Sequence, residues 1–198
     1  MSLIDSDGNK YQDLAAFHMN MPDKEEAEPR DIYFVRHGDT EDNDKGLCRG
    51  WSTVGLNADG RKDAEKAAES VKDKQLHQIV ASDLPRAAQT ADIISRKLGV
   101  PVEHDPGLRT WDIGAYQEQP EKDVQEHLDR LQLRAPDERP PPGKSPGESY
   151  NEFKHRFLGA VSGVLQRHPD KEVMVVSHNS PAKVLDEWTK KNGGQRTG

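Results

Sequence analysis

Three short apolar runs limit the folds open to this chain more than any other feature of its sequence. They span residues 32–35, 78–81 and 173–176, and each ends in a polar turn that is followed by a helix-like pattern. Runs of this length bounded by turns are typical of buried strands. Strands that alternate with helices predict an α/β fold with three αβα layers and a mostly parallel central sheet.

Chemically active side chains follow each of these runs. Arg36 and His37 come directly after the first, Arg86 lies in the segment after the second, and His178 comes after the third. The carboxyl ends of parallel strands share one edge of a sheet, so these four residues are expected to meet there. Two guanidiniums and two imidazoles would form a pocket for a doubly charged anion such as phosphate. The alternative is a structural role as loop anchors or ion pairs.

Composition narrows the class of protein. A chain of 198 residues predicts one domain with a core of its own. Its formal charge of −7 argues against a nucleic-acid partner. The single cysteine, Cys48, excludes an intramolecular disulfide, and the sequence has neither a signal-like start nor an apolar run of about 18 residues. We therefore expect a cytoplasmic protein that does not enter a membrane.

The first thirty residues differ from the rest of the chain. Residues 1–30 are polar and end in a charged run between two prolines, which predicts an arm or linker before a domain at 31–198. Asp5–Asn9 superficially resembles a calcium loop, but Ala16 stands where a bidentate Glu is needed. No metal site is predicted.

The domain itself divides into predicted helices and one polar insertion. Helical patterns cover 59–74, 85–98, 148–168 and 181–191, and Gly99 is placed to end the second of them. Residues 116–147 are rich in charged side chains, Gln and Pro, which indicates a lid-like insertion.

Four segments in this order and spacing resemble the histidine phosphatase superfamily, in its phosphoglycerate mutase-like branch. The segments are Arg36–Asn43, Arg49–Gly60, Ser82–Ala91 and Val175–His178, within a match from about residue 31 to about 188. The resemblance implies a phosphoglycerate mutase-like fold and catalysis without metal or organic cofactor. It also implies that His37 becomes phosphorylated, that Arg36 and Arg86 hold the phosphate, and that His178, if protonated, adds a third cation.

Further substrate-binding candidates come from the same segments. The family counterparts of Asn43 and Arg49 line the phosphate pocket, and Thr40 belongs to the signature itself. For Asn43 and Arg49 a structural role is an equal alternative. The family counterpart of the insertion covers the pocket and helps to select substrates.

The chain departs from the family at the proton donor. The mutase-like branch has a Glu four residues before a glycine, in a segment like 108–114, and this chain has Thr110 there. A hydroxyl cannot act as an acid near neutral pH, so the nearby Asp112 is the first candidate for general acid, with a structural role as the alternative.

These observations predict a phosphatase that hydrolyses small phosphate monoesters through a phosphohistidine. The alternatives are a phosphoglycerate mutase and a phosphate-binding pseudoenzyme that lacks the general acid. The expected partner is a small phosphoester or phosphate. Only about twenty residues follow His178, so a homodimer that completes the sheet is a further alternative.

Overall fold

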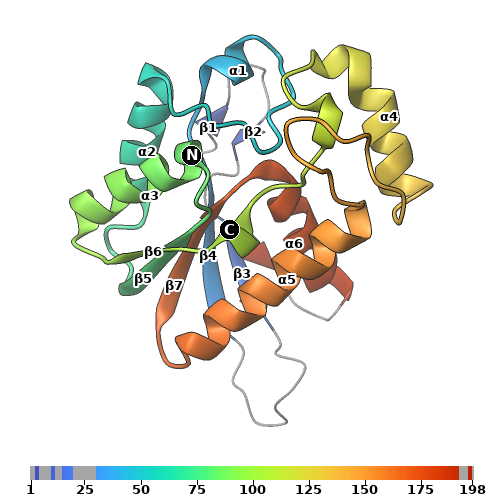
Figure 1. Ribbon diagram of the computed structural model, residues 1–198. Helices are drawn as coiled ribbons and strands as arrows, with labels where there is room; N and C mark the ends of the chain where they lie inside the picture. Colours follow the sequence, from blue (N-terminus) through green and yellow to red (C-terminus); the bar gives the residue numbers. More distant parts are fainter. Residues whose placement is uncertain (1–2, 5–9, 12–14, 20–29, 192–195, 198) are drawn as a thin grey trace.

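A mostly parallel sheet forms the centre of the molecule in the computed structural model, which describes residues 3–4, 10–11, 15–19, 30–191 and 196–197. Its strand order is β6–β5–β7–β4–β3–β8 (Figure 1). The four parallel strands are β4 (Arg30–Arg36), β5 (Leu76–Ala81), β6 (Val102–His104) and β7 (Glu172–Ser177). The α/β prediction is confirmed, and β4 lies beside β7, so the ends that carry His37 and His178 are neighbours.

One edge of the sheet differs from the sequence prediction. Strand β3 (Ala15–Met19) pairs antiparallel with β4, and β8 (Arg196–Thr197) pairs antiparallel with β3. The short strands β1 (Leu3–Ile4) and β2 (Lys10–Tyr11) form a separate ribbon. The prediction that residues 15–19 belong to a linker is therefore wrong. The backbone of β4 can form hydrogen bonds along both of its edges, so a segment from the polar arm can pair with it. The calcium-like segment Asp5–Asn9 lies outside the described residues.

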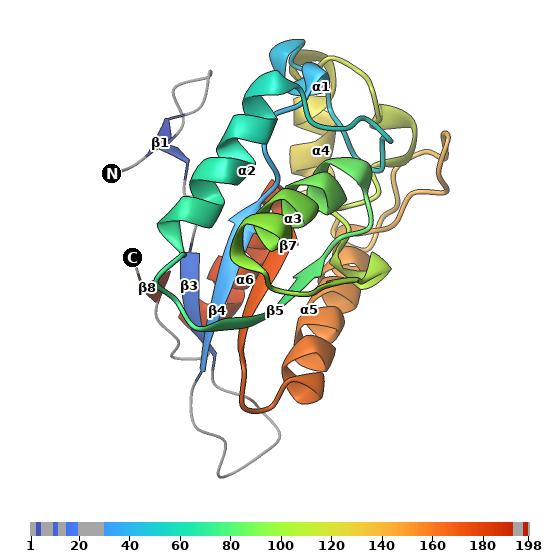
Figure 2. The same cartoon turned by 90° about the vertical axis from the view of Figure 1, so that its left-hand side faces the viewer.

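Helices cover both faces of the sheet. Helices α2 (Ala58–Ser70) and α3 (Pro85–Leu98) pack on one face, and Figure 2 views the molecule from their side. Helices α5 (Tyr150–Arg167) and α6 (Asn179–Lys191) pack on the other face. The strands are buried between these layers, which is why their sequences are continuously apolar.

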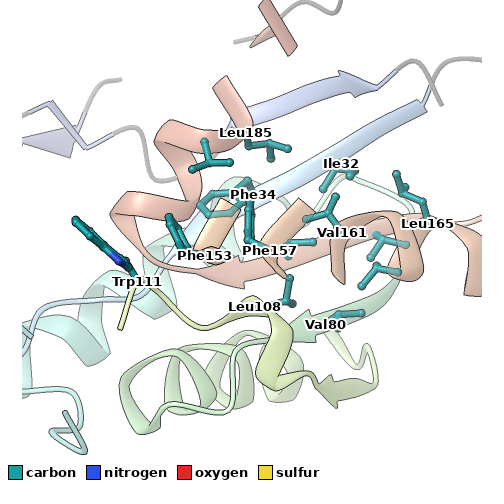
Figure 3. Packing of buried hydrophobic residues seen from close by; sticks show 14 of the residues in the cluster. Ile32, Phe34, Val80, Leu108, Trp111, Phe153, Phe157, Val161, Leu165 and Leu185 are labelled. Atoms are coloured by element: carbon teal, nitrogen blue, oxygen red, sulfur yellow. The ribbon is translucent and has the colours of Figure 1, made fainter. Parts of the chain in front are cut away.

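Alternate residues of each central strand belong to the two halves of the core. Ile32 and Phe34 of β4 point toward α5, where they meet Phe153 and Phe157, as Figure 3 shows. Their neighbours Tyr33 and Val35 join the small side chains of α2 and α3 instead. This period of two is what a strand buried on both faces requires.

Helix ends follow the expected capping chemistry. Gly99 ends α3 in the left-handed conformation, with φ of 70°, as predicted. The Ser149 side chain accepts a hydrogen bond from the Glu152 backbone N–H, and the Glu152 carboxylate accepts one from the Ser149 N–H, so a capping box begins α5.

Short helices surround the carboxyl ends of the parallel strands. They are α1 (Glu41–Asp44), the 3₁₀ turns η1 (Pro106–Leu108) and η2 (Gly114–Tyr116), and α4 (Glu121–Leu133), which lies within the insertion. None of the helices in the described part of the chain is both long and apolar enough to cross a membrane.

Candidate active site

His37 lies at the carboxyl end of β4 with its reactive nitrogen fixed by its neighbours. Its backbone N–H donates to the Ser177 carbonyl at 3.0 Å, which ties it to the end of β7. The ring Nδ1 lies 2.8 Å from the Gly38 carbonyl oxygen, which can only accept, so Nδ1 carries the proton. Nε2 therefore keeps its lone pair and accepts a hydrogen bond of 3.2 Å from Nε of Arg86. This is the tautomer that a nucleophilic imidazole needs.

Arg86 connects this nucleophile to the loop after α1. It lies in the first turn of α3 with a buried guanidinium. Its Nη1 donates to the Ser52 carbonyl at 3.0 Å and its Nη2 to the Gly50 carbonyl at 2.8 Å. Burial, and then the nearby Arg49, lower the pKa of Arg86 to about 9, so the group still carries its charge at neutral pH. The loop, the cation and the nucleophile thus form one unit.

His178 stands beside His37, with ring centroids 5.1 Å apart. Its Nε2 lies 2.9 Å from Oγ of Ser82, and that oxygen also accepts from the Leu84 N–H. The Ser82 hydroxyl can accept two hydrogen bonds and donate one, so this contact fits either tautomer of the neutral ring. Nδ1 is buried and has no hydrogen-bond partner among the described residues.

Burial and positive charge keep both rings neutral. Burial is the main cause that lowers the pKa of His37 and of His178 well below 6.5, and Arg86 is the next. A neutral His37 is competent as a nucleophile at neutral pH. A neutral His178 does not supply the third cation that protonation would have given.

These groups line a cavity of about 170 Å³. Arg49 and Gly50 lie beside the two histidines and Arg86. The other walls come from the 110–113 segment, α4 and α6, and include Thr110, Trp111, Ile113, Glu121, Gln125, Leu128, Gln132, Asn179, Ser180 and Lys183. An anion held here would meet several cations within a polar enclosure.

The model of the histidine phosphatase superfamily (branch 1) matches residues 32–192. The chain belongs to this superfamily. Its relatives include proteins named as phosphatases and others named as mutases. It is 32% identical over 154 residues to the uncharacterized phosphatase PhoE of Bacillus subtilis, covering 78% of this chain and 74% of that one. It is 33% identical over 154 residues to the probable phosphoglycerate mutase GpmB of Cronobacter sakazakii, with 74% and 68% covered.

A solved structure from the superfamily matches the fold. The mycobacterial glucosyl-3-phosphoglycerate phosphatase in its complex with VO3 superposes with a TM-score of 0.66 at 26% identity, over 80% of this chain and 79% of that one. The three-layer arrangement predicted from the sequence is thus the fold of a known histidine phosphatase.

Arg36 and Arg49 add positive charge around the histidine phosphatase centre. Arg49 lines the cavity, and burial followed by Arg36 lowers its pKa. Arg36 is not among the residues that line this cavity, but its charge also lowers the pKa of His37 and of His178. The positive charges of the cluster repel one another, so the cluster favours a bound anion.

Thr40 and Asn43 lie apart from the cavity. The Thr40 backbone N–H and hydroxyl both donate to Oδ1 of Asn43, at 3.2 and 2.7 Å, and together the two residues cap α1. Neither residue lines the cavity in this structure. Their place in the family signature is explained here by the turn that leads from His37 into α1.

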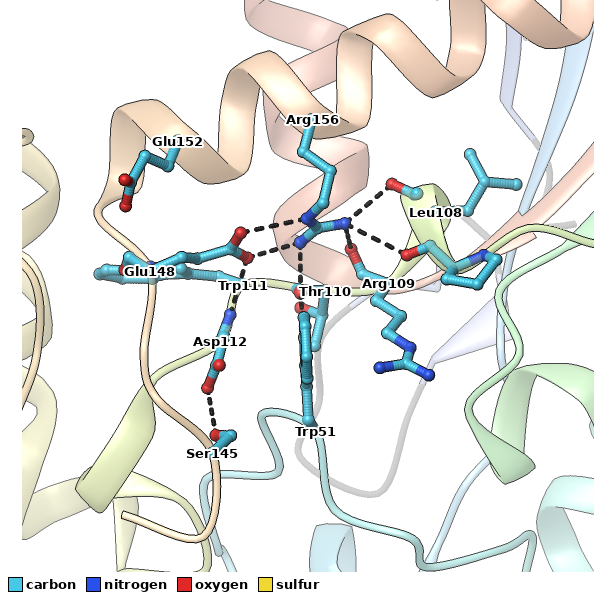
Figure 4. A network of polar contacts seen from close by, with 12 residues as sticks. Trp51, Leu108, Arg109, Thr110, Trp111, Asp112, Ser145, Glu148, Glu152 and Arg156 are labelled. Atoms are coloured by element: carbon cyan, nitrogen blue, oxygen red, sulfur yellow. Dashed lines mark hydrogen bonds and ion pairs between the residues drawn. The ribbon is translucent and has the colours of Figure 1, made fainter. Parts of the chain in front are cut away.

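Asp112 anchors the insertion. Its buried carboxylate accepts hydrogen bonds from the backbone N–H groups of Gly114 and Gly147, at 3.1 and 3.0 Å. It also accepts one from the Ser145 hydroxyl (Figure 4). It does not line the cavity. These contacts favour the structural role that the sequence left open for Asp112, because its oxygens are engaged by the far end of the insertion.

Arg156 of α5 is a positioning residue that sequence reasoning did not identify. Its guanidinium donates to the carbonyl oxygens of Gly107, Arg109 and Thr110, at 2.8, 3.1 and 3.0 Å, and pairs with Glu148 (Figure 4). Trp51 donates from Nε1 to the same Thr110 carbonyl at 2.8 Å. The sequence did offer one signal for it, because Arg156 lies next to the apolar stripe of the predicted helix 148–168. The network fixes Thr110 in the cavity wall.

Proposed function

We propose that this chain is a phosphatase that hydrolyses small phosphate monoesters through a phosphohistidine on Nε2 of His37. The observation that carries the proposal is that this nitrogen is unprotonated. The Gly38 carbonyl holds the ring proton on Nδ1, and Nε2 keeps its lone pair at a cavity lined with cations. Its hydrogen bond from Arg86 must break before Nε2 attacks a phosphate.

The proposed reaction has two steps. Nε2 of His37 attacks phosphorus, the N–P bond forms, and the bond to the ester oxygen breaks. Arg86, Arg49 and Arg36 stabilise the negative charge on the phosphoryl oxygens. Water then attacks the phosphohistidine and releases inorganic phosphate, which restores the imidazole.

The walls of the cavity favour a small, polar leaving group. Gln125, Leu128 and Gln132 of α4 and Lys183 of α6 line the cavity. The related mycobacterial enzyme is named for a phosphorylated sugar acid. A leaving group with hydroxyl or carboxylate groups would suit the same kind of wall.

Labelling that is quenched in alkaline detergent, where an N–P bond survives, tests the nucleophile. His37→Ala is expected to abolish both turnover of a phenyl phosphate and the acid-labile phosphoenzyme, whereas His155→Ala, at an exposed site on α5, leaves both unchanged. A His37→Ala protein that retains most of its turnover contradicts the proposal. A wild-type protein that binds phosphate but never becomes labelled is the predicted pseudoenzyme.

A phosphoglycerate mutase is the second candidate, because relatives at 33% identity carry that name. Such an enzyme would use the same nucleophile but return the phosphoryl group to the glycerate. Product analysis with 3-phosphoglycerate separates the two functions. Inorganic phosphate as the main product supports the phosphatase, and 2-phosphoglycerate supports the mutase.

A further inference from the structure

Glu121 is the one acidic side chain among the described residues that line the cavity. It is the first residue of α4, and its backbone N–H donates to the Gly46 carbonyl at 2.9 Å. Next to it, Pro120 forms a bridge with Leu47. The start of α4 is thereby attached to the loop that carries Arg49, and Glu121 is held at the wall of the cavity.

The charge of Glu121 acts on the anion-binding groups. It raises the pKa of Arg49, against the lowering effect of burial. It is also the second cause, after burial, that raises the pKa of the Cys48 thiol to about 11. Both affected residues line the cavity, so the exposed carboxylate of Glu121 still lies within electrostatic range of the site.

None of the other described residues that line the cavity carries a carboxyl group that could protonate an alkoxide leaving group. Thr110 lines the cavity at the position of the family's acid, but its hydroxyl does not ionise near neutral pH. The Asp112 carboxylate is engaged with the insertion. His37 acts as the nucleophile, and burial and the nearby Arg86 lower the pKa of His178 well below 6.5, so its ring is neutral.

We propose that Glu121 is the general acid and base of this enzyme, supplied by the insertion in place of the residue missing at Thr110. This inference rests on the phosphohistidine mechanism proposed above.

The proton balance uses Glu121 twice. In the first step the ester P–O bond breaks while the N–P bond forms, and the departing oxygen takes the proton of the Glu121 carboxyl. In the second step the Glu121 carboxylate takes a proton from water, whose oxygen bonds to phosphorus as the N–P bond breaks. The carboxyl group is thereby regenerated.

A series of leaving groups tests the proposal. Glu121→Gln keeps the shape of the side chain but cannot give up a proton, so kcat/KM for alkyl phosphates should fall by roughly 10² to 10⁴-fold. Aryl phosphates with acidic leaving groups should change little, because they need no proton. Asp123→Asn, at an exposed acid in the same turn of α4, is the control and should leave the whole series unchanged.

A double variant and the phosphoenzyme assay distinguish a role of Glu121 as general acid from a structural role. Thr110→Glu, added to Glu121→Gln, should restore part of the alkyl phosphate turnover, which a change in packing alone would not produce. Equal losses for alkyl and aryl phosphates, or no loss at all, would overturn the assignment of Glu121. In either case a phosphoenzyme that still forms from the aryl substrate leaves the proposed function intact, whereas its absence in the wild-type protein overturns both.

Discussion

Asp112→Asn is expected to weaken the fold without changing which substrates are preferred. Asparagine keeps one carbonyl oxygen, which can still accept from Gly114 and Ser145, but its amide nitrogen would face the N–H of Gly147. One charge-assisted hydrogen bond is lost, two are weakened, and a buried N–H remains unpaired. Hydrogen bonds to charged groups contribute about 1.5–3 kcal/mol each, so the free energy of unfolding should fall by about 2–4 kcal/mol.

Thermal unfolding and steady-state kinetics measure the two parts of this prediction. For a chain of this size each kcal/mol lowers Tm by about 2–4 °C, so a decrease of roughly 4–16 °C is expected. The ratio of kcat/KM for alkyl and aryl phosphates should stay at the wild-type value. An unchanged Tm together with a selective loss on alkyl phosphates would refute this reasoning and make Asp112 the acid.

Two further predictions follow from the centre of the molecule. The pKa values of His37 and His178 lie well below 6.5 in the folded protein, so the unfolded chain binds more protons as pH falls below about 6.5. The two rings should therefore add no pH dependence of stability above about pH 7, and below pH 6.5 they should lower stability by at most about 1.4 kcal/mol per pH unit for each ring. A denaturant titration at constant ionic strength that shows no such decrease contradicts the neutral pair. A Cβ on Gly38 would overlap the carbonyl oxygen of Gly60, so Gly38→Ala should cost about 1–3 kcal/mol or more in chemical denaturation, whereas Gly159→Ala, where nothing lies within 4 Å, should not destabilise.

The sequence alone determined the arrangement of the main strands and helices of this protein. Short apolar runs with turns at their ends favour buried strands between helical layers, and parallel strands have their carboxyl ends at one edge of the sheet. The places of His37, Arg86 and His178 follow from that geometry. The bounds of α3 (85–98) were also predictable, because Pro85 and Gly99 act on the backbone locally.

The tertiary structure decided how the polar side chains of the site are used. A carboxylate acts as an acid or as an anchor according to the donors that surround it, and for Asp112 these come from Ser145 and Gly147, more than thirty residues away. Likewise Glu121 reaches the cavity only because the start of α4 pairs with the loop before Arg49. Hydrogen-bond partners and electric fields depend on distances in space, and a sequence pattern constrains these only where the backbone itself is regular.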